Sequence, residues 1–262
     1  MKNLIVILFL LVISSNIRSQ PVHICDDSAE WPPYIYYSRM DNKLDKSNLN
    51  GATIDLFKEI FKLAKLEYSI QLRPWKRCLL DVENFGKKQR YEVFSNGSFS
   101  RERAKKYYVS TPIYQTNQGL FYSTKKYPNG LAINKLSDLN NFKKICGIHG
   151  YSYEEYKLNQ NPYQGANDIT TALKMLSLQR CDIFLSSIEP VYGGEVIGKY
   201  TIPADITNIV IPELKPTTFH LFISKSSPRA YELVTKLNQA ILILQHNGIS
   251  EKIFKKHLAK EK

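Results

Sequence analysis

The sequence is poor in the residues and motifs that mark metal sites and common active sites. Its five histidines are dispersed, and none lies at ligand spacing from a pair of the four cysteines, which form no CxxC motif. It contains no GxSxG motif, no catalytic-triad order and no phosphate-binding glycine loop. It also has no internal repeat and no low-complexity segment. We therefore expect no metal, no cofactor and no catalysis by these routes.

Long apolar runs are absent as well, apart from the first residues. A lysine precedes an apolar run at residues 4–13, which is too short to span a bilayer, and the polar stretch SSNIRSQ follows. This pattern predicts a secretory signal peptide over residues 1–20. An N-terminal membrane anchor is the alternative, and a lipoprotein anchor is disfavoured because the first cysteine, Cys25, lies well beyond the run. We expect an exported, periplasmic protein.

Charge of one sign predominates, with a formal net charge of +12. The lysines are scattered along expected helix faces, as in IFKKHLAKEK, and such scatter is typical of a solvated surface. Export makes nucleic acid a still poorer partner, so we expect none. A basic surface would nevertheless attract anionic ligands or an anionic envelope.

Strand and helix patterns alternate along the rest of the chain. EYSIQL, RYEVFS, QGLFYS, KKICGI and CDIFLS read as strands, and RCLLDVENFGKK, between the first two, reads as a helix. The stretch GATIDLFKEIFKLAKL predicts a helix whose apolar face is Ile54, Phe57, Ile60, Phe61 and Ala64. Asn167 or Asp168 is expected to cap the helix NDITTALKML. A long helix should begin with Ser227 as its N-cap and end at Gly248. This alternation predicts an α/β fold with mostly parallel sheets.

Two segments rich in proline and polar residues, STPIYQTNQG and IPELKPTT, separate the halves of this pattern. If both are crossovers, residues 115–216 form one lobe. Residues 21–114 and 217–262 then form the other.

An even number of cysteines in an exported protein predicts two disulfides, and four cysteines allow three pairings. If each expected lobe contains one bridge, the order of the cysteines in the sequence favours the pairs Cys25–Cys78 and Cys146–Cys181. Each would stabilise the fold by about 4 kcal/mol in the chain-entropy model.

Five segments in this order resemble the family-3 bacterial extracellular solute-binding proteins, whose best-known members bind polar amino acids. They are EWPPYIYY, NGATIDLFKEIFKLAKL, SNGSFSRERAKKYYVSTPIY, HGYSYEEY and LNQAILILQHNGISEKIFKKHL. The resemblance implies a two-lobe periplasmic-binding-protein fold of type II, with a two-strand hinge. It implies a ligand held between the lobes at the carboxyl ends of the strands. The usual role is delivery of a solute to the permease of an ABC-type transporter.

The resemblance also implies roles for residues of the first lobe. Arg103 matches the arginine that pairs with the ligand carboxylate, and Asn96 and Ser98 match the small polar residues before it. The alternative is that Arg103 belongs to a charged surface run, RERAKK. Trp31 and Trp75 match two aromatic residues that clamp the ligand, although packing at strand ends is a common alternative for tryptophan.

Arg77, two residues after Trp75, would add a second ligand cation if it points inward, and otherwise it forms a structural salt bridge. In the second lobe, Tyr151 and Ser152 of HGYSY match the turn that grips the acidic end of the ligand. Nearby His149 either contacts the ligand or is solvated.

One departure concerns Ser187, which stands where amino-acid-binding relatives carry an aspartate for the ligand's α-ammonium. A hydroxyl cannot offset a buried ammonium as a carboxylate does. Glu189 could substitute if its loop is rearranged; otherwise an ordinary zwitterionic amino acid is not the expected ligand.

We expect a monomeric, non-catalytic protein that binds a small carboxylate or zwitterion. Two other functions stay open. The chain could present its ligand to a membrane sensor. It could also be a dehydratase-like or lyase-like enzyme on the same fold, with Glu30, His149 or Glu189 as the general acid or base.

Overall fold

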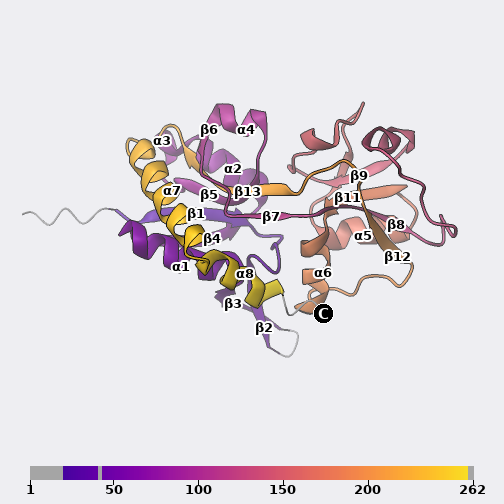
Figure 1. The fold of residues 1–262 in the computed structure, drawn as a ribbon, viewed down its shortest axis with the longest axis horizontal. Coiled ribbons are helices and arrows are strands. Elements are labelled where there is room, and N and C mark those ends of the chain that lie inside the picture. Colours follow the sequence, from indigo (N-terminus) through magenta and orange to yellow (C-terminus); the bar gives the residue numbers. More distant parts are fainter. Residues whose placement is uncertain (1–19, 41–42, 259–262) are drawn as a thin grey trace, which may run out of the picture.

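The structure, a computed structural model, describes residues 20–40 and 43–258. The expected signal peptide therefore lies outside the described residues, apart from Gln20. The described chain forms two lobes that lie side by side, each built on one central sheet (Figure 1). Lobe 1 comprises residues 20–40, 43–116 and 217–258, and lobe 2 comprises residues 118–210. No helix within the described residues combines the length and apolarity needed to span a membrane.

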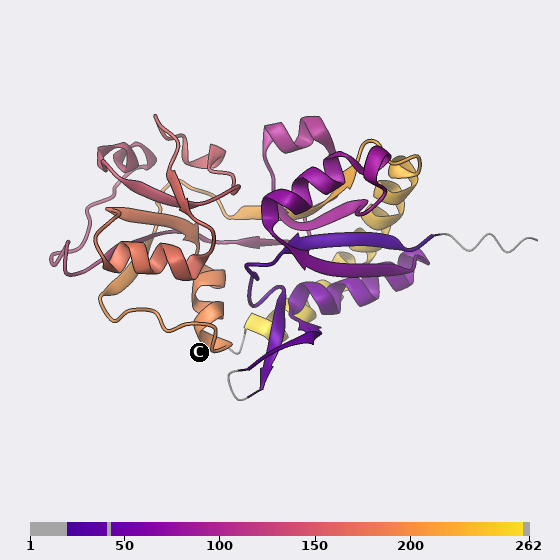
Figure 2. The ribbon, with the colours of Figure 1, turned by 180° about the vertical axis from the view of Figure 1, so that it is seen from behind.

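Lobe 1 contains a six-stranded sheet with the order β4-β1-β5-β13-β6, and β7 pairs with β13. The first and the last described elements both belong to this lobe, where the yellow helices α7 and α8 lie beside the indigo and purple elements in both views (Figure 2). The strands are β1 Val22–Asp27, β4 Tyr68–Arg73, β5 Val93–Ser98, β6 Tyr107–Val109, β7 Tyr114–Thr116 and β13 Thr217–Ser224.

Helix α1 (Ala52–Ala64) covers lobe 1 with the apolar face that its sequence predicts. All five expected residues are buried, because they recur at three- and four-residue intervals. The remaining helices of this lobe are α2 Trp75–Glu83, α3 Phe85–Lys88, α4 Arg101–Lys106, α7 Ala230–His246 and α8 Ile249–Leu258.

Lobe 2 contains a five-stranded sheet with the order β10-β9-β11-β8-β12. Helix α5 (Ile169–Ser177) packs on it through its buried residues Ile169, Ala172, Leu173 and Leu176. The Asp168 side chain caps this helix, as predicted, by accepting a hydrogen bond from Thr171 N at 2.7 Å. The other elements are β8 Gln118–Ser123, η1 Leu136–Asn141, β9 Ile145–Ile148, η2 Glu154–Tyr156, β10 Tyr163–Ala166, β11 Ile183–Ser187, α6 Ile188–Val196 and β12 Ile206–Val210.

Both sheets are mixed, which corrects the expectation that they are mostly parallel. In lobe 1, β1 runs parallel to β4 and β5, but β13 runs antiparallel to β5, β6 and β7. In lobe 2, β9 runs parallel to β10 and β11, whereas β8 runs antiparallel to β11 and β12. The antiparallel strands are those next to the crossings between lobes, because the chain returns through each sheet there.

The two crossings form a hinge, with Thr116 of β7 paired to Thr217 of β13. Two further differences from the sequence-based expectation concern local elements. A hairpin of β2 (Tyr36–Met40) and β3 (Lys43–Asn50) was not predicted. Helix α7 begins at Ala230 rather than at Pro228, because the Ser227 hydroxyl accepts a hydrogen bond from Arg229 N instead of capping the helix.

Each lobe contains one of the two predicted disulfides, Cys25–Cys78 and Cys146–Cys181, with Cα atoms 5.7 and 5.8 Å apart. Both pairings are therefore confirmed. The first bridge ties β1 to α2, and the second ties β9 to the start of β11, so each fixes a strand to its neighbouring βα unit.

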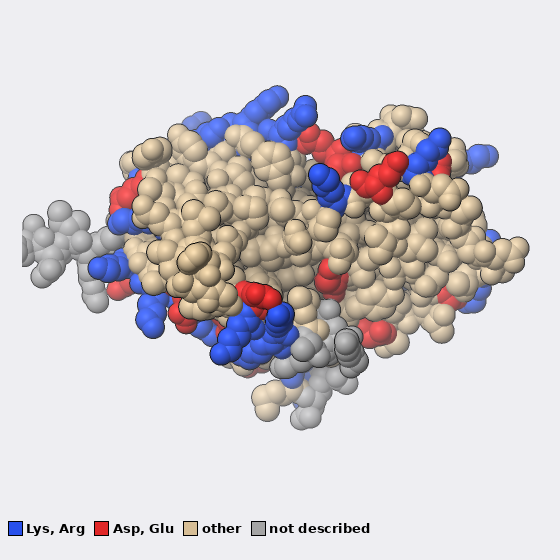
Figure 3. Space-filling view, viewed as in Figure 1, with Lys and Arg blue, Asp and Glu red and all other residues tan. Residues whose placement is uncertain are grey.

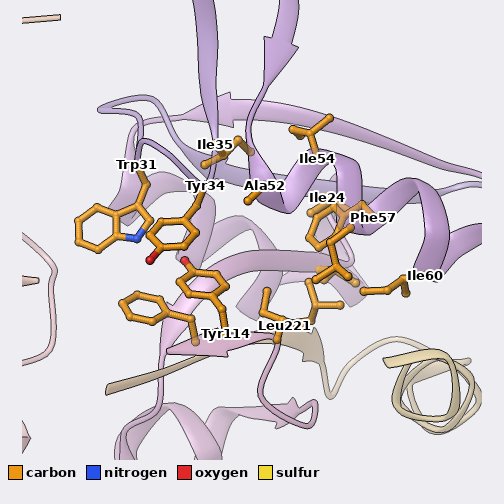
Figure 4. Close-up of a cluster of buried hydrophobic side chains, with 14 of the residues drawn as sticks. Ile24, Trp31, Tyr34, Ile35, Ala52, Ile54, Phe57, Ile60, Tyr114 and Leu221 are labelled. Carbon is orange, nitrogen blue, oxygen red and sulfur yellow. The ribbon is translucent and has the colours of Figure 1, made fainter. Parts of the chain in front are cut away.

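A row of aromatic rings leads from the core of lobe 1 to its edge. Tyr114 stacks on Tyr34 at 4.0 Å and on Phe219 at 4.9 Å between ring centroids. Trp31 lies at the end of this row, 5.7 Å from Phe219 (Figure 4). Such stacked pairs contribute beyond simple apolar burial, so the row gives this edge of the lobe a rigid wall.

Charged residues occupy the rim of the face seen in Figure 3, in several separate groups where lysine and arginine alternate with acids. Ion pairs such as Lys58–Asp55 and Lys255–Glu251 lie on exposed helix faces. This face therefore has the mixed, solvated character that the scattered lysines predict.

Candidate ligand-binding site

A pocket lies between the two lobes and contains about 560 Å³ of space, part of it open to solvent. Eight of the nine predicted ligand-binding residues line it. Lobe 1 contributes Trp31, Trp75, Asn96, Ser98 and Arg103, and lobe 2 contributes Tyr151, Ser152 and Ser187. The fold thus brings together predicted residues that are up to 156 positions apart in the chain.

Arg103, on the short helix α4, is 8% exposed. Its Nη1 donates to the backbone oxygen of Ser98 at 2.7 Å and to Ser98 Oγ at 2.9 Å, and its Nη2 donates to Gly150 O at 3.4 Å. Within the described residues, Nε has no hydrogen-bond acceptor and no carboxylate forms an ion pair with this guanidinium. Burial lowers the pKa of Arg103 to about 10, which leaves it cationic at neutral pH.

Trp75 begins helix α2, and its indole lies beside the same arginine. The Arg103 guanidinium carbon is 5.6 Å from the ring centroid, within the range of a cation–π contact. The indole Nε1 donates to Gly150 O of lobe 2 at 3.1 Å. Gly150 O therefore accepts from two lobe 1 side chains and holds the lobes together at this edge of the pocket.

Trp31 also lines the pocket and contacts Tyr151 of lobe 2, with ring centroids 5.6 Å apart in an edge-on arrangement. The Tyr151 hydroxyl donates to Asp27 Oδ2 at 3.3 Å, which adds a further hydrogen bond between the lobes. The ring neighbours of Trp31 are Tyr151 and Phe219, and that of Trp75 is Phe94. The two tryptophans thus line one pocket but are each supported by other aromatic residues.

Asn96 positions neighbouring groups, since both ends of its amide are occupied by protein partners. Its Nδ2 donates to Asp26 Oδ2 at 2.7 Å, and its Oδ1 accepts from Thr53 Oγ1 and from the Tyr114 hydroxyl, each at 2.9 Å. Its backbone has a positive φ of 52°, a conformation that asparagine tolerates better than most residues. Asn96 therefore fixes the end of strand β5, which carries Ser98 beside Arg103.

Sequence reasoning missed three carboxylates that line the pocket, Asp26, Asp27 and Glu155. Burial raises the pKa of Asp26 to about 7 and the pKa of Asp27 to about 6. Burial likewise raises the pKa of Glu155. Asp26 and Asp27 are the last residues of strand β1. Acids at the carboxyl end of a buried strand lie where ligands bind in such folds, so the sequence could have predicted these two as pocket residues.

Ser187 ends strand β11 and lies in a network of neutral groups. Its hydroxyl oxygen accepts from Thr116 Oγ1 at 2.8 Å and from Gln118 Nε2 at 3.0 Å. The adjacent Ser186 is buried, lines the pocket and has no hydrogen-bond partner for its hydroxyl among the described residues. A hydroxyl of this kind is satisfied when a solute supplies the missing partner.

Four other candidates lie outside the pocket lining. Arg77 is exposed on α2, so the inward orientation needed for a second ligand cation is absent. Glu189 accepts hydrogen bonds from the backbone and side chain of Asn117, each at 2.9 Å, and this holds it away from the site. Glu30 pairs with Arg39 and Lys199, and His149 is exposed.

Close contacts between the lobes continue below the pocket. Lys199 of lobe 2 donates to Ala29 O and lies 3.4 Å from Glu30 Oε2. Gly193 of α6 packs against the backbone of Pro32, where a Cβ atom added to the glycine would lie only 2.7 Å from the carbonyl oxygen. The lobes are thus closed on one another in this structure.

The sequence profile of the bacterial extracellular solute-binding proteins, family 3, matches residues 24–260. The chain belongs to this family. A search of curated proteins found no match.

Solved structures with the fold of this family cover nearly the whole chain at low identity. An amino acid ABC transporter substrate-binding protein from Streptococcus pneumoniae, bound to L-arginine, is 18% identical with a TM-score of 0.69, covering 92% of this chain and 95% of its own. An arginine-, lysine- and histidine-binding protein from Geobacillus stearothermophilus is 17% identical with a TM-score of 0.69, covering 93% and 97%. A histidine kinase sensor domain is 18% identical with a TM-score of 0.69, covering 92% and 97%.

Proposed function

We propose that this solute-binding protein captures a small amino-acid-like solute by its carboxylate and delivers it, outside the cytoplasmic membrane, to the permease of an ABC transporter. The protein acts without catalysis, as a monomer, and is released into the periplasm by cleavage of a signal peptide. The solved structures of amino acid transporter components support the solute class and the partner, and the family supports the location.

The observation that carries the proposal is the state of Arg103. A buried guanidinium without a protein carboxylate is costly unless an anionic ligand compensates its charge. Its Nη1 is occupied by Ser98, whereas Nε has no partner in the described part of the chain and Nη2 makes one long hydrogen bond. The Nε and Nη2 edge is the one that can pair with both oxygens of a carboxylate.

The acids of the pocket favour a binding role over the enzymatic alternative. Asp26 accepts from Ser95 Oγ, Asn96 Nδ2 and the Asp27 backbone, so both of its oxygens are engaged by protein groups. The three residues expected as a general acid or base, Glu30, His149 and Glu189, do not line the pocket. A carboxylate whose two oxygens are both held by protein donors, as in Asp26, fixes the site and is poorly placed to exchange a proton with a solute.

Delivery of the solute to a sensor is the second candidate, because the fold is shared with a histidine kinase sensor domain. The gene neighbourhood separates the two roles. A permease and an ATPase encoded beside this protein favour transport, and a lone signalling kinase favours sensing.

The test of the site begins with a thermal-shift screen of L-arginine, L-histidine, L-glutamine and L-glutamate, since a ligand raises apparent stability by mass action. Calorimetry with the best binder then compares Arg103→Ala, Arg103→Lys and the exposed control Arg77→Ala. We expect Arg103→Ala to weaken binding about 30-fold or more. Arg103→Lys should be intermediate, because an ammonium lacks the paired N–H edge.

Arg77→Ala should change affinity by no more than about twofold, since exposed substitutions have small effects. Unaltered carboxylate binding by Arg103→Ala would contradict the proposed site. Comparable losses in both arginine variants would indicate a general effect of surface charge.

A further inference from the structure

We propose that Glu155, in the short helix η2 of lobe 2, is the carboxylate that recognises the cationic amino group of the solute and thereby determines specificity for zwitterions. This inference rests on the proposed function of the pocket. It concerns a residue that the sequence pattern did not indicate.

The three pocket carboxylates differ in how far protein donors already satisfy them. Asp26 accepts three hydrogen bonds from protein groups. Asp27 accepts from the backbone N–H of Ala29 at 2.9 Å and from the Tyr151 hydroxyl. Glu155 accepts a single hydrogen bond within the described residues, from Thr217 Oγ1 at 2.5 Å. A half-buried carboxylate with one neutral donor gains the most from a cation.

The location of Glu155 supports the same assignment. Its partner Thr217 begins β13 and pairs in register with Thr116, whose hydroxyl donates to Ser187. The adjacent Tyr156 donates to Gln118 Oε1 at 2.7 Å, and Gln118 Nε2 donates to Ser187 Oγ. Glu155 and Ser187 thus belong to one network around the hinge, to which Glu155 supplies a carboxylate.

The two charged groups of the pocket that would meet a zwitterion come from different lobes. Arg103 and its Ser98 support come from lobe 1, whereas Glu155 comes from lobe 2 and is anchored at the hinge. A solute with a carboxylate and an ammonium contacts both lobes, so its binding favours the closed state. Burial raises the pKa of Glu155, and a bound cation offsets that effect by favouring the ionised form.

Matched pairs of solutes test the inference by calorimetry at pH 7.5. Each pair is an amino acid of the screen and the same molecule without its α-ammonium: L-arginine with 5-guanidinopentanoate, L-histidine with 3-(imidazol-4-yl)propanoate, L-glutamine with 4-carbamoylbutanoate, and L-glutamate with glutarate. For the amino acid that binds, we expect the wild type to prefer it to its partner about 30-fold or more. Glu155→Gln should bring this ratio near one while leaving the affinity for the deaminated partner unchanged, which also shows that the variant is folded.

Two further variants complete the test. Glu155→Asp keeps a carboxylate and should retain a ratio clearly above that of Glu155→Gln. Glu189→Gln removes an acid that lies close to Ser187 in the sequence but outside the pocket lining, and it should keep the wild-type ratio.

A wild-type ratio preserved in Glu155→Gln, or equal ratios for the Gln and Asp variants, would overturn the role of Glu155 and leave the Arg103 site intact. If the wild type binds the deaminated compounds as tightly as the amino acids, the role of Glu155 is likewise overturned and the Arg103 site is left intact. Binding of none of the eight compounds would instead refute the proposed function, and this inference with it.

Discussion

Gly193 offers a direct test of whether closure of the two lobes contributes to affinity. It lies within helix α6 of lobe 2, and an added Cβ atom would lie 2.7 Å from Pro32 O and 2.8 Å from Pro32 C of lobe 1. Ordinary contacts between such atoms are about 3.5 Å, so Gly193→Ala must separate the lobes here by about 1 Å. Both atoms belong to backbone, and neither can turn aside as a flexible side chain would.

The expected loss follows from the contacts next to this point. Lys199 loses good geometry to Ala29 O and to Glu30, and each weakened hydrogen bond costs about 1 kcal/mol. With the remaining overlap, the closed state should lose about 1–3 kcal/mol, which corresponds to about 5- to 150-fold weaker solute binding. Calorimetry measures this affinity, and small-angle scattering with saturating solute should show a larger radius of gyration than that of the wild type.

The same substitution should not destabilise the fold. Alanine has a higher helix propensity than glycine by about 1 kcal/mol, so the unfolding free energy of the variant should be unchanged or raised. The exposed Val196→Ala, in the last turn of α6, serves as the control and should bind as the wild type does. Wild-type affinity in Gly193→Ala, with an unchanged radius, would refute the link between closure and binding.

Two further predictions concern stability. Replacing Cys25 and Cys78 together by alanine should lower the unfolding free energy by about 4 kcal/mol, because the bridge closes a loop of 53 residues. Urea titrations measure this change. A loss below about 1 kcal/mol would contradict the entropic account. The other prediction concerns Asp26, whose pKa burial raises from 3.8 to about 7. Between those pH values the unfolded chain releases a proton that the folded protein keeps. The unfolding free energy therefore falls as the pH rises. Asp26→Asn should show a smaller fall than the wild type between about pH 4.5 and 8, and parallel curves for the two proteins would disprove this assignment.

The helices with strong periodicity could be predicted from the sequence, and the hairpin could not. The apolar residues of α1 recur on one face because that face covers the lobe 1 sheet. In β2 and β3, most side chains are exposed or half-buried, so burial imposes no clear alternation on the sequence. Their pairing depends on where the chain returns after Pro33, which no local pattern specifies.

The orientation of Arg77 illustrates an avoidable error. Trp75 and Arg77 lie in the same helix, two residues and about 200° apart around its axis. If Trp75 faces the pocket, Arg77 must face solvent. The sequence pattern indicates a helix only from Arg77 onward. In the structure the helix begins at Trp75, and this earlier start excludes Arg77 as a second cation for the ligand.

Glu155 illustrates what sequence reasoning could not reach. It lies in YSYEEY, where two adjacent acids are typical of a solvated loop. Its partner Thr217 is 62 residues away, and only the return of the chain through the hinge brings the two together. Arg103, by contrast, could be assigned through the family resemblance, because the segment SNGSFSRER that carries it is continuous in the sequence and forms one strand–turn–helix unit.

The position of β13 within the lobe 1 sheet has a consequence for the order in which the protein matures. This strand lies between β5 and β6, yet it follows the whole of lobe 2 in the chain. As the polypeptide emerges from a ribosome or translocon, lobe 2 can complete its sheet while lobe 1 still lacks an internal strand and the helix α7. Lobe 1 therefore depends on contacts of high sequence separation, which form slowly. Residues 217–258 complete the first lobe, and the unfinished protein keeps an open sheet edge until they arrive.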